Sequence, residues 1–250
     1  MTRLDGRVAV VTGASKGLGK AIALALGGAG ARVAMVARSR AQIEEAATAA
    51  RAAGADAEPF VADVTDEAQV AALAAAVSGR FSKVNILVNN AGVNVRKNLT
   101  EFTLEEWRHV VDTNLTGVFL MCRAFLPLMK GHGYGRILNL TSIMSHIALP
   151  GRTAYCASKA GLLGLTRALA LEVAAEGITV NGVSPGPFAT EMNTPLLESP
   201  ELNEFFTSRI PLGHWGKVDD IGKLALYLCS EEAEFITGTD VRIDGGWCAQ

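Results

Sequence analysis

The chain carries little charge and has no basic cluster. Charged residues make up 19% of the 250 residues, and the formal net charge is −2. Proteins that bind nucleic acid or an anionic membrane through charge concentrate lysine and arginine on one surface. The composition therefore argues against nucleic acid and membrane partners and leaves a small molecule as the expected ligand.

Cysteine is also scarce, with four residues spread through the chain. They form no C-x-x-C pair and no Cys/His pattern, so the motifs typical of zinc and dithiol redox sites are missing. We expect no metal site and reduced thiols, as in cytoplasmic proteins. The residues are Cys122, Cys156, Cys229 and Cys248.

Long apolar runs are missing as well. The most apolar stretch, residues 110–129, contains Asp112, Asn114 and Arg123, which makes it a poor membrane span. Residues 1–7 lead into a strand-like segment without the apolar core of a secretory signal. We therefore expect a cytoplasmic protein.

Short β-branched runs alternate with helical patterns six times along the chain. This alternation predicts an α/β fold in one domain over residues 1–250, a doubly wound (Rossmann) parallel sheet with helices on both faces. Residues 144–151 and 187–212 break the repeat, and we expect them to meet substrate at the carboxyl ends of the strands, where such sheets bind ligands. The predicted strands are residues 7–12, 32–37, 57–61, 84–88, 136–140 and 178–183.

A glycine-rich turn follows the first predicted strand. Gly13, Gly17 and Gly19 stand between Thr12 and a helical pattern. Glycine lets the backbone approach a pyrophosphate closely, and the N-terminus of the next helix offers free N–H groups. The turn predicts a dinucleotide site, with an ordinary glycine-rich loop as the alternative.

The end of the second predicted strand indicates which dinucleotide is bound. An NAD site usually has an acidic residue there for the ribose 2′-hydroxyl, whereas this chain has Ala37 followed by Arg38. Arg38 and Lys16 of the glycine turn can bind a 2′-phosphate. The sequence therefore favours NADP(H) over NAD(H), with solvated loop cations as the alternative.

Polar residues follow the third and fourth predicted strands. Asp63 can accept a hydrogen bond from an adenine amino group, but it can equally be a turn residue or cap the next helix. Asn89 and Asn90 form either a loop that faces the cofactor or a simple turn. Within the helical pattern of residues 103–129, Asn114 lies among poor helix formers, which predicts a kink that frees a carbonyl for a bound water.

Ser142, Tyr155 and Lys159 form a candidate catalytic set. Residues four apart share a helix face, so the Tyr155 hydroxyl and the Lys159 ammonium can face one cleft. A nearby ammonium favours phenolate and lowers the tyrosine pKa. Hydride transfer at a carbonyl carbon needs a proton carrier and a donor that holds the oxygen, which suits Tyr155 and Ser142 respectively. The alternative is a chance surface pair.

Together these motifs resemble the short-chain dehydrogenase/reductase family, of the single-domain type, over residues 6–246. Thr141, where the family often has serine, and Cys156 after the tyrosine depart from its pattern. The resemblance rests on five motifs in family order: Thr12-Gly13-x-x-x-Gly17-x-Gly19, Asn89-Asn90-Ala91-Gly92, Asn114, Ser142 with Tyr155-x-x-x-Lys159, and Pro185-Gly186.

The resemblance implies an oxidoreductase that interconverts a secondary alcohol and a ketone. It implies that Tyr155 is the general acid/base, that Ser142 holds the substrate oxygen, that Lys159 binds the nicotinamide ribose and lowers the Tyr155 pKa, and that Asn114 positions a relay water. It implies a cofactor site made of Gly13, Ser15, Lys16, Gly17, Leu18, Gly19, Arg38, Asp63, Val64, Asn90, Gly92, Tyr155, Lys159, Pro185, Gly186, Phe188 and Thr190.

Family members are commonly tetramers joined through two long helices and a C-terminal segment. Residues 117–129 and 161–170 are apolar enough to fit a homotetramer, although the same surfaces would serve the core of a monomer.

The substrate is expected near Asn94, Arg96, Ser142, Met144 and Arg152, whose cationic and polar groups suit a carboxylate. The runs at residues 94–97 and 187–197 resemble those of gluconate-type sugar-acid dehydrogenases. Much of the remaining chain is as similar to 3-oxoacyl-carrier-protein reductases. A sugar acid is thus the preferred substrate and a 3-oxoacyl thioester the alternative. A binding protein without turnover is a third possibility, against which the intact catalytic set argues.

Overall fold

The computed structural model describes residues 2–249. Its strands form one seven-stranded sheet, all parallel, in the order β3-β2-β1-β4-β5-β6-β7. The chain reverses its direction of winding between β1 and β4, and this switch point opens a crevice at the carboxyl ends of the strands. The strands are β1 (Val8–Thr12), β2 (Arg32–Ala37), β3 (Asp56–Val61), β4 (Ile86–Asn89), β5 (Gly135–Leu140), β6 (Ile178–Pro185) and β7 (Asp240–Ile243).

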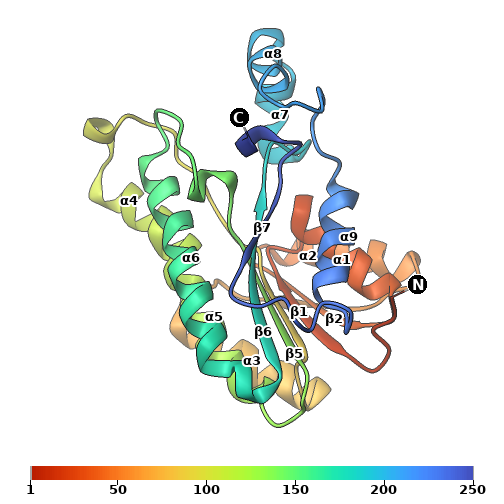
Figure 1. The fold of residues 1–250 in the computed structure, drawn as a ribbon. Coiled ribbons are helices and arrows are strands. Elements are labelled where there is room, and N and C mark those ends of the chain that lie inside the picture. The colour runs from red at the N-terminus through yellow and green to blue at the C-terminus, as the bar shows by residue number, and fades with distance from the viewer. Residues whose placement is uncertain (1, 250) are drawn as a thin grey trace.

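Helices cover both faces of the sheet (Figure 1). One face packs against α1 (Gly17–Gly28), α2 (Arg40–Ala52) and α9 (Val218–Leu228), and the other against α3 (Glu67–Phe81), α5 (Gly117–Met129) and α6 (Thr153–Val173). Alternate residues of each central strand enter the two cores, which is why these strands are mostly apolar. The predicted doubly wound parallel sheet is confirmed.

β7 was not among the predicted strands. It lies at the sheet edge, pairs only with β6 and is not fully buried at any of its four positions. An edge strand of this length lacks the apolar run that marks the central strands. Smaller differences concern element ends, since α1 begins at Gly17 and β4 at Ile86.

The interruption predicted around Asn114 is a π-helical turn. Residues Asp112–Thr116 join α4 (Leu104–Val111) to α5, and the Gly117 N–H donates to the Asp112 carbonyl five residues earlier. Such turns widen a helix locally and often occur at functional sites.

Two short helices, α7 (Thr194–Leu197) and α8 (Pro200–Thr207), stand beyond the carboxyl edge of the sheet (Figure 1). They belong to a third apolar cluster, which we call the roof and which consists of Ile143, Met144, Leu196, Phe206, Ile210 and Trp247. The remaining short turns are residues Leu99–Glu101, Ile143–Ser145, Ala174–Glu176, Glu191–Asn193 and Trp247–Ala249.

Two further findings concern the sequence expectations. None of the helices within residues 2–249 combines the length and apolarity needed to cross a membrane. All four cysteines are free thiols, and burial raises the pKa of Cys122 and Cys229 to about 12, which makes both unreactive.

Candidate active site

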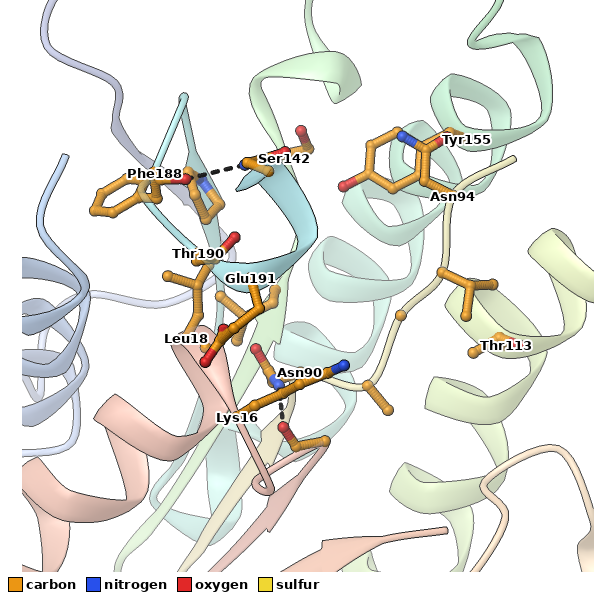
Figure 2. A pocket seen from close by; sticks show the side chains of 18 of the residues that line it. Lys16, Leu18, Asn90, Asn94, Thr113, Ser142, Tyr155, Phe188, Thr190 and Glu191 are labelled. Atoms are coloured by element: carbon orange, nitrogen blue, oxygen red, sulfur yellow. Dashed lines mark hydrogen bonds between the residues drawn. The ribbon is translucent and has the colours of Figure 1, made fainter. Parts of the chain in front are cut away.

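A cleft of about 440 Å³ runs along the carboxyl edge of the sheet, from the end of β2 to the roof. Figure 2 shows Lys16, Leu18 and Asn90 at one end, Ser142 and Tyr155 at the other, and Thr190 between them. All the residues predicted to meet substrate line it, as do all those predicted to bind cofactor except Gly19. Both non-repetitive stretches contribute to its wall.

The glycine turn at the start of α1 is open to an anion. Gly13 and Gly17 have φ angles of +63° and +55°, which L side chains rarely adopt. Lys16 precedes the helix without a side-chain cap, and no acidic residue lies in the first turn. The N–H groups of this helix end therefore have no side-chain partner and fit a pyrophosphate.

Asn90 holds this turn in place. Its Nδ2 donates to the carbonyls of Thr12, at 2.9 Å, and Gly13, at 3.2 Å. A Cβ atom at Gly19 would lie 2.3 Å from Asn90 Nδ2 and 2.4 Å from the Gly13 oxygen. Gly19 thus packs beneath the turn and does not line the cleft. The sequence analysis expected Gly19 to bind cofactor. The glycine spacing shows that Gly19 is close to the turn, but it cannot show whether Gly19 faces the cofactor or the protein interior.

The far end of the cleft lies at the end of β2. The Arg38 side chain is 59% exposed, and its Nη1 lies 3.8 Å from Asp63 Oδ2, a loose contact that a phosphate can replace. Ser39 caps α2 by accepting from the Gln42 N–H at 3.4 Å, and no acid lies in the first turn of that helix. Ser39 and Gln42 also line the cleft and were missed, although a serine before a helical pattern is a recognisable cap.

Asp63 is a turn residue. Its Oδ1 accepts from the Thr65 N–H at 2.9 Å and from the Thr65 hydroxyl at 2.8 Å. The cap of α3 is Asp66, which accepts from the Gln69 N–H at 3.0 Å. The interpretation of Asp63 as a turn residue is therefore confirmed, and its interpretation as a helix cap is wrong. Asp63 also lines the cleft, with its Oδ2 beside Arg38.

Ser142 and Tyr155 meet at the substrate end. Ser142 follows β5, and its Oγ accepts from the Met144 N–H at 3.1 Å. Burial raises the pKa of the Tyr155 phenol, and a hydrogen bond with Ser142 and the charges of Arg152 and Arg96 act in the opposite direction. The pKa of Tyr155 is therefore raised, whereas a neighbouring ammonium was expected to lower it. Burial outweighs the opposing effect of the two arginines.

Lys159 lies one helical turn beyond Tyr155 and is only 4% exposed. Its Nζ donates to the Leu140 carbonyl at 2.5 Å and lies 5.8 Å from the centre of the Tyr155 ring. Burial lowers the Lys159 pKa to about 8. Lys159 thus lines the cleft beside Tyr155, and its ammonium is held by the end of β5.

Asn114 lies behind the cleft and is fully buried. Its Oδ1 accepts from the Val93 N–H at 2.8 Å, and its Nδ2 donates to the Val93 carbonyl at 2.9 Å and to Ser158 Oγ at 3.1 Å. The side chain therefore fastens the loop after Gly92 to α6.

Two arginines face the substrate end without an acidic partner. Within residues 2–249, no ion pair joins Arg96 or Arg152 to a carboxylate, whereas the adjacent Lys97 pairs with Glu106. Burial and the neighbouring Arg96 lower the pKa of the half-buried Arg152. A half-buried arginine beside a second arginine, with no carboxylate paired to either, is suited to binding an anion.

The other wall of the substrate end is apolar. Leu149, Leu196, Phe206 and Trp215 line it, and the Phe206 and Trp215 rings lie 5.3 Å apart. The predicted stretches 144–151 and 187–212 contain Leu149, Leu196 and Phe206 without singling any of them out, and Trp215 lies outside both. Their signal was weak, because scattered apolar residues are as frequent in an ordinary core.

Asn94 also lies at the substrate end, and its Oδ1 is buried without a hydrogen-bond partner. Buried polar atoms in native proteins are nearly always paired. A ligand hydroxyl or a water would supply the missing donor.

The chain is similar over nearly its whole length to known reductases and dehydrogenases. A family model described as enoyl-(acyl carrier protein) reductase matches residues 13–248. The 3-oxoacyl-[acyl-carrier-protein] reductase of Haemophilus influenzae is 39% identical over 244 residues, covering 97% of this chain and 98% of that protein. Gluconate 5-dehydrogenase of Gluconobacter oxydans is 35% identical over 243 residues, covering 97% of this chain and 95% of that protein.

Solved structures agree with these matches. Gluconate 5-dehydrogenase from Burkholderia cenocepacia, in complex with NADP and tartrate, has a TM-score of 0.95 at 35% identity. The similarity covers 99% of this chain and 97% of that one.

Proposed function

Because the chain belongs to the short-chain dehydrogenase/reductase family of oxidoreductases, we propose that it interconverts a secondary hydroxyl and a ketone on a gluconate-type sugar acid, with NADP(H). The observation that carries the choice of substrate is the pair of arginines, Arg96 and Arg152, at the substrate end without a carboxylate partner. The relatives named as gluconate 5-dehydrogenases, one of them in complex with tartrate, support this class of substrate.

The cleft has the parts that this reaction needs. A bound nicotinamide cofactor supplies or accepts the hydride. The Ser142 hydroxyl, which already accepts from the Met144 N–H, is left to donate to the substrate oxygen. Tyr155 moves the proton at that oxygen, and its raised pKa keeps the phenol protonated at neutral pH, ready to donate during ketone reduction.

Lys159 and Asn114 act behind the tyrosine. We assign the contact with the nicotinamide ribose to the Lys159 ammonium, which the Leu140 carbonyl holds. A Cβ atom at Gly92 would lie 3.2 Å from Asn114 Oδ1 and 3.7 Å from Lys159 Nζ, so the two residues share one small space. We assign a relay water to this space, beside Asn114 and Lys159.

We expect Arg152→Ala to lower kcat/KM for gluconate by about 10-fold to 100-fold. A hydrogen bond to a charged group contributes about 1.5–3 kcal/mol, and each 1.4 kcal/mol is about tenfold. Arg96→Ala should have the smaller effect, because Arg96 is exposed. Steady-state kinetics with gluconate and with a neutral secondary alcohol measures both.

Lys97→Ala is the matched control, since it removes a neighbouring cation that is already paired with Glu106. Its kcat/KM for gluconate should equal that of the parent. Equal losses for gluconate and the neutral alcohol in the arginine variants would contradict recognition of an anionic group.

A second function is favoured by the apolar wall. Leu196, Phe206 and Trp215 can cover an acyl chain, and a 3-oxoacyl-[acyl-carrier-protein] reductase is 39% identical. Reduction of a 3-oxoacyl thioester with the higher kcat/KM would establish this alternative in the same assay.

We propose NADP(H) as the preferred cofactor. Ala37 leaves no carboxylate to repel a 2′-phosphate, and Arg38 and Ser39 lie at the same end of the cleft. One charge-assisted contact should favour NADPH over NADH by at least about 10-fold at low salt. Replacing Ala37 by Asp together with Arg38 by Ala should reverse the order by adding repulsion and removing attraction. Fluorescence titration of both cofactors tests this, and equal Kd values for the parent would contradict it.

We also propose a cytoplasmic homotetramer joined through α5 and α6. Phe119 on α5 is 47% exposed and Leu171 on α6 is 83% exposed, and a partner subunit would cover such side chains. Sedimentation at micromolar concentration should give about four times the mass of one chain, and a monomer would contradict the assembly.

A further inference from the structure

A carboxylate lies directly behind Ser142 and has no part in the proposed chemistry. Asp240, the first residue of β7, has a side chain only 8% exposed. Gly182 on β6 makes room for it, since a Cβ atom there would lie 2.1 Å from Asp240 Oδ1. A buried carboxylate is costly unless several donors satisfy it.

Three donors from three separate segments meet this carboxylate. The Thr141 hydroxyl lies 2.5 Å from Oδ1, the Ser184 hydroxyl 2.6 Å from Oδ2 and His146 Nε2 2.7 Å from Oδ2. Thr141 follows β5, Ser184 belongs to β6, and His146 follows the turn at residues 143–145. Asp240 therefore joins the elements on either side of Ser142.

The Ser184 hydroxyl has only one proton, which limits the hydrogen bonds that it can donate. Ser184 has one hydroxyl proton but three acceptors within reach: Asp240 Oδ2, Thr141 Oγ1 at 2.9 Å, and the Ser142 carbonyl at 2.9 Å. When Thr141 donates to Oδ1 and His146 donates to Oδ2 from its protonated Nε2, both carboxylate oxygens are satisfied. At 2.6 Å from Oδ2 the Ser184 hydroxyl must also direct its proton to the carboxylate, and the Ser142 carbonyl at 2.9 Å shares that proton in a bifurcated hydrogen bond.

That last bond fixes the backbone of Ser142. Ser142 has an extended backbone, and its side chain turns back to cap the next turn through Met144. Thr141, Ser142 and Ser184 are all buried, so no solvent replaces a lost partner. These bonds give a change at Asp240 a route to the Ser142 backbone through Ser184 and Thr141.

We propose that Asp240 is a positioning residue for Ser142, acting through Thr141, Ser184 and His146. The proposal rests on the role assigned to Ser142 above. It places a determinant of the reaction rate on the edge strand, outside the cleft, because Asp240 does not line the cleft.

Asp240→Asn should lower kcat about 10-fold and leave the Kd for NADPH unchanged. The amide keeps the shape of the side chain but replaces one acceptor with an NH₂ group that faces donors. Ser184→Ala should lower kcat to a similar extent, and the double variant should lose no more than either single one, because both remove the same tether. Asp220→Asn, an exposed acid that pairs with Lys223 on α9, is the matched control and should match the parent.

The deciding measurement combines Asp240→Asn with Ser142→Ala. If Asp240 acts through Ser142, the second change has no further effect on kcat once the Ser142 hydroxyl is gone. A further tenfold loss in that background would overturn the proposal, because it would show a general structural effect. A parent-like kcat for both Asp240→Asn and Ser184→Ala would also overturn it.

The same variants distinguish a failure of this inference from a failure of the proposed function. A large loss with Ser142→Ala but none with Asp240→Asn or Ser184→Ala removes the inference alone. A parent-like kcat for Ser142→Ala removes the assigned role of Ser142 and the inference with it. If Asp240→Asn fails to fold, Ser184→Ala alone and combined with Ser142→Ala gives the same test.

Discussion

Replacing Tyr155 by phenylalanine is expected to lower kcat by about 10²–10⁴, the usual contribution of a general acid or base. Phenylalanine keeps the ring that packs beside the roof and removes only the hydroxyl. The fold and cofactor binding should therefore survive. Turnover is measured under saturating cofactor, together with the Kd for NADPH and the melting temperature.

Tyr227→Phe is the matched control, because Tyr227 lies on α9 and is 45% exposed. Its kcat should equal that of the parent. A Tyr155→Phe enzyme within a few-fold of the parent would show that another group moves the proton.

The pH dependence of the reaction rate is a second test of the role of Tyr155. Ketone reduction needs the phenol and alcohol oxidation needs the phenolate, so reduction should slow and oxidation should accelerate as the pH rises toward the Tyr155 pKa. Because burial raises that pKa, the oxidation rate should still be rising at alkaline pH. The Tyr155→Phe variant should lose this dependence.

Replacing Ser142 by alanine is the change with the next largest expected effect, about 10²–10³ in kcat. We propose above that this hydroxyl holds the substrate oxygen, and such a donor stabilises the transition state more than the ground state. A loss confined to KM would contradict this role, since it would indicate ground-state binding alone.

The Ser142 variant should also change the titration of Tyr155. A hydrogen bond with Ser142 lowers the pKa of that phenol. Without this hydrogen bond the Tyr155 pKa should be higher still, because burial then raises it with less opposition. The residual oxidation activity should therefore increase at a higher pH than in the parent. Stopped-flow or steady-state profiles of Ser142→Ala against pH measure the shift, and an unchanged profile would show that the two hydroxyls do not interact.

Sequence alone determined the parts of this protein that depend on local pattern. The six predicted strands carry short apolar runs between helical patterns, so they could be found from the sequence, whereas β7 has four residues, none fully buried, and could not. Gly13 and Gly17 mark their turn because few residues accept a positive φ. The Tyr155 and Lys159 pair follows from helical spacing.

Only the tertiary structure decided what depends on contacts between distant segments. The Tyr155 pKa is raised because solvent is excluded by residues that the spacing of Tyr155 and Lys159 does not reveal. The proposal of an anion site at Arg96 and Arg152 depends on folding, which brings both near Tyr155 and pairs neither with an acid within residues 2–249. Asp240 meets Thr141, Ser184 and His146 across 56 to 99 residues of chain. Local periodicity determines which element forms, whereas burial and charge pairing depend on which elements become neighbours, and only the folded chain shows this.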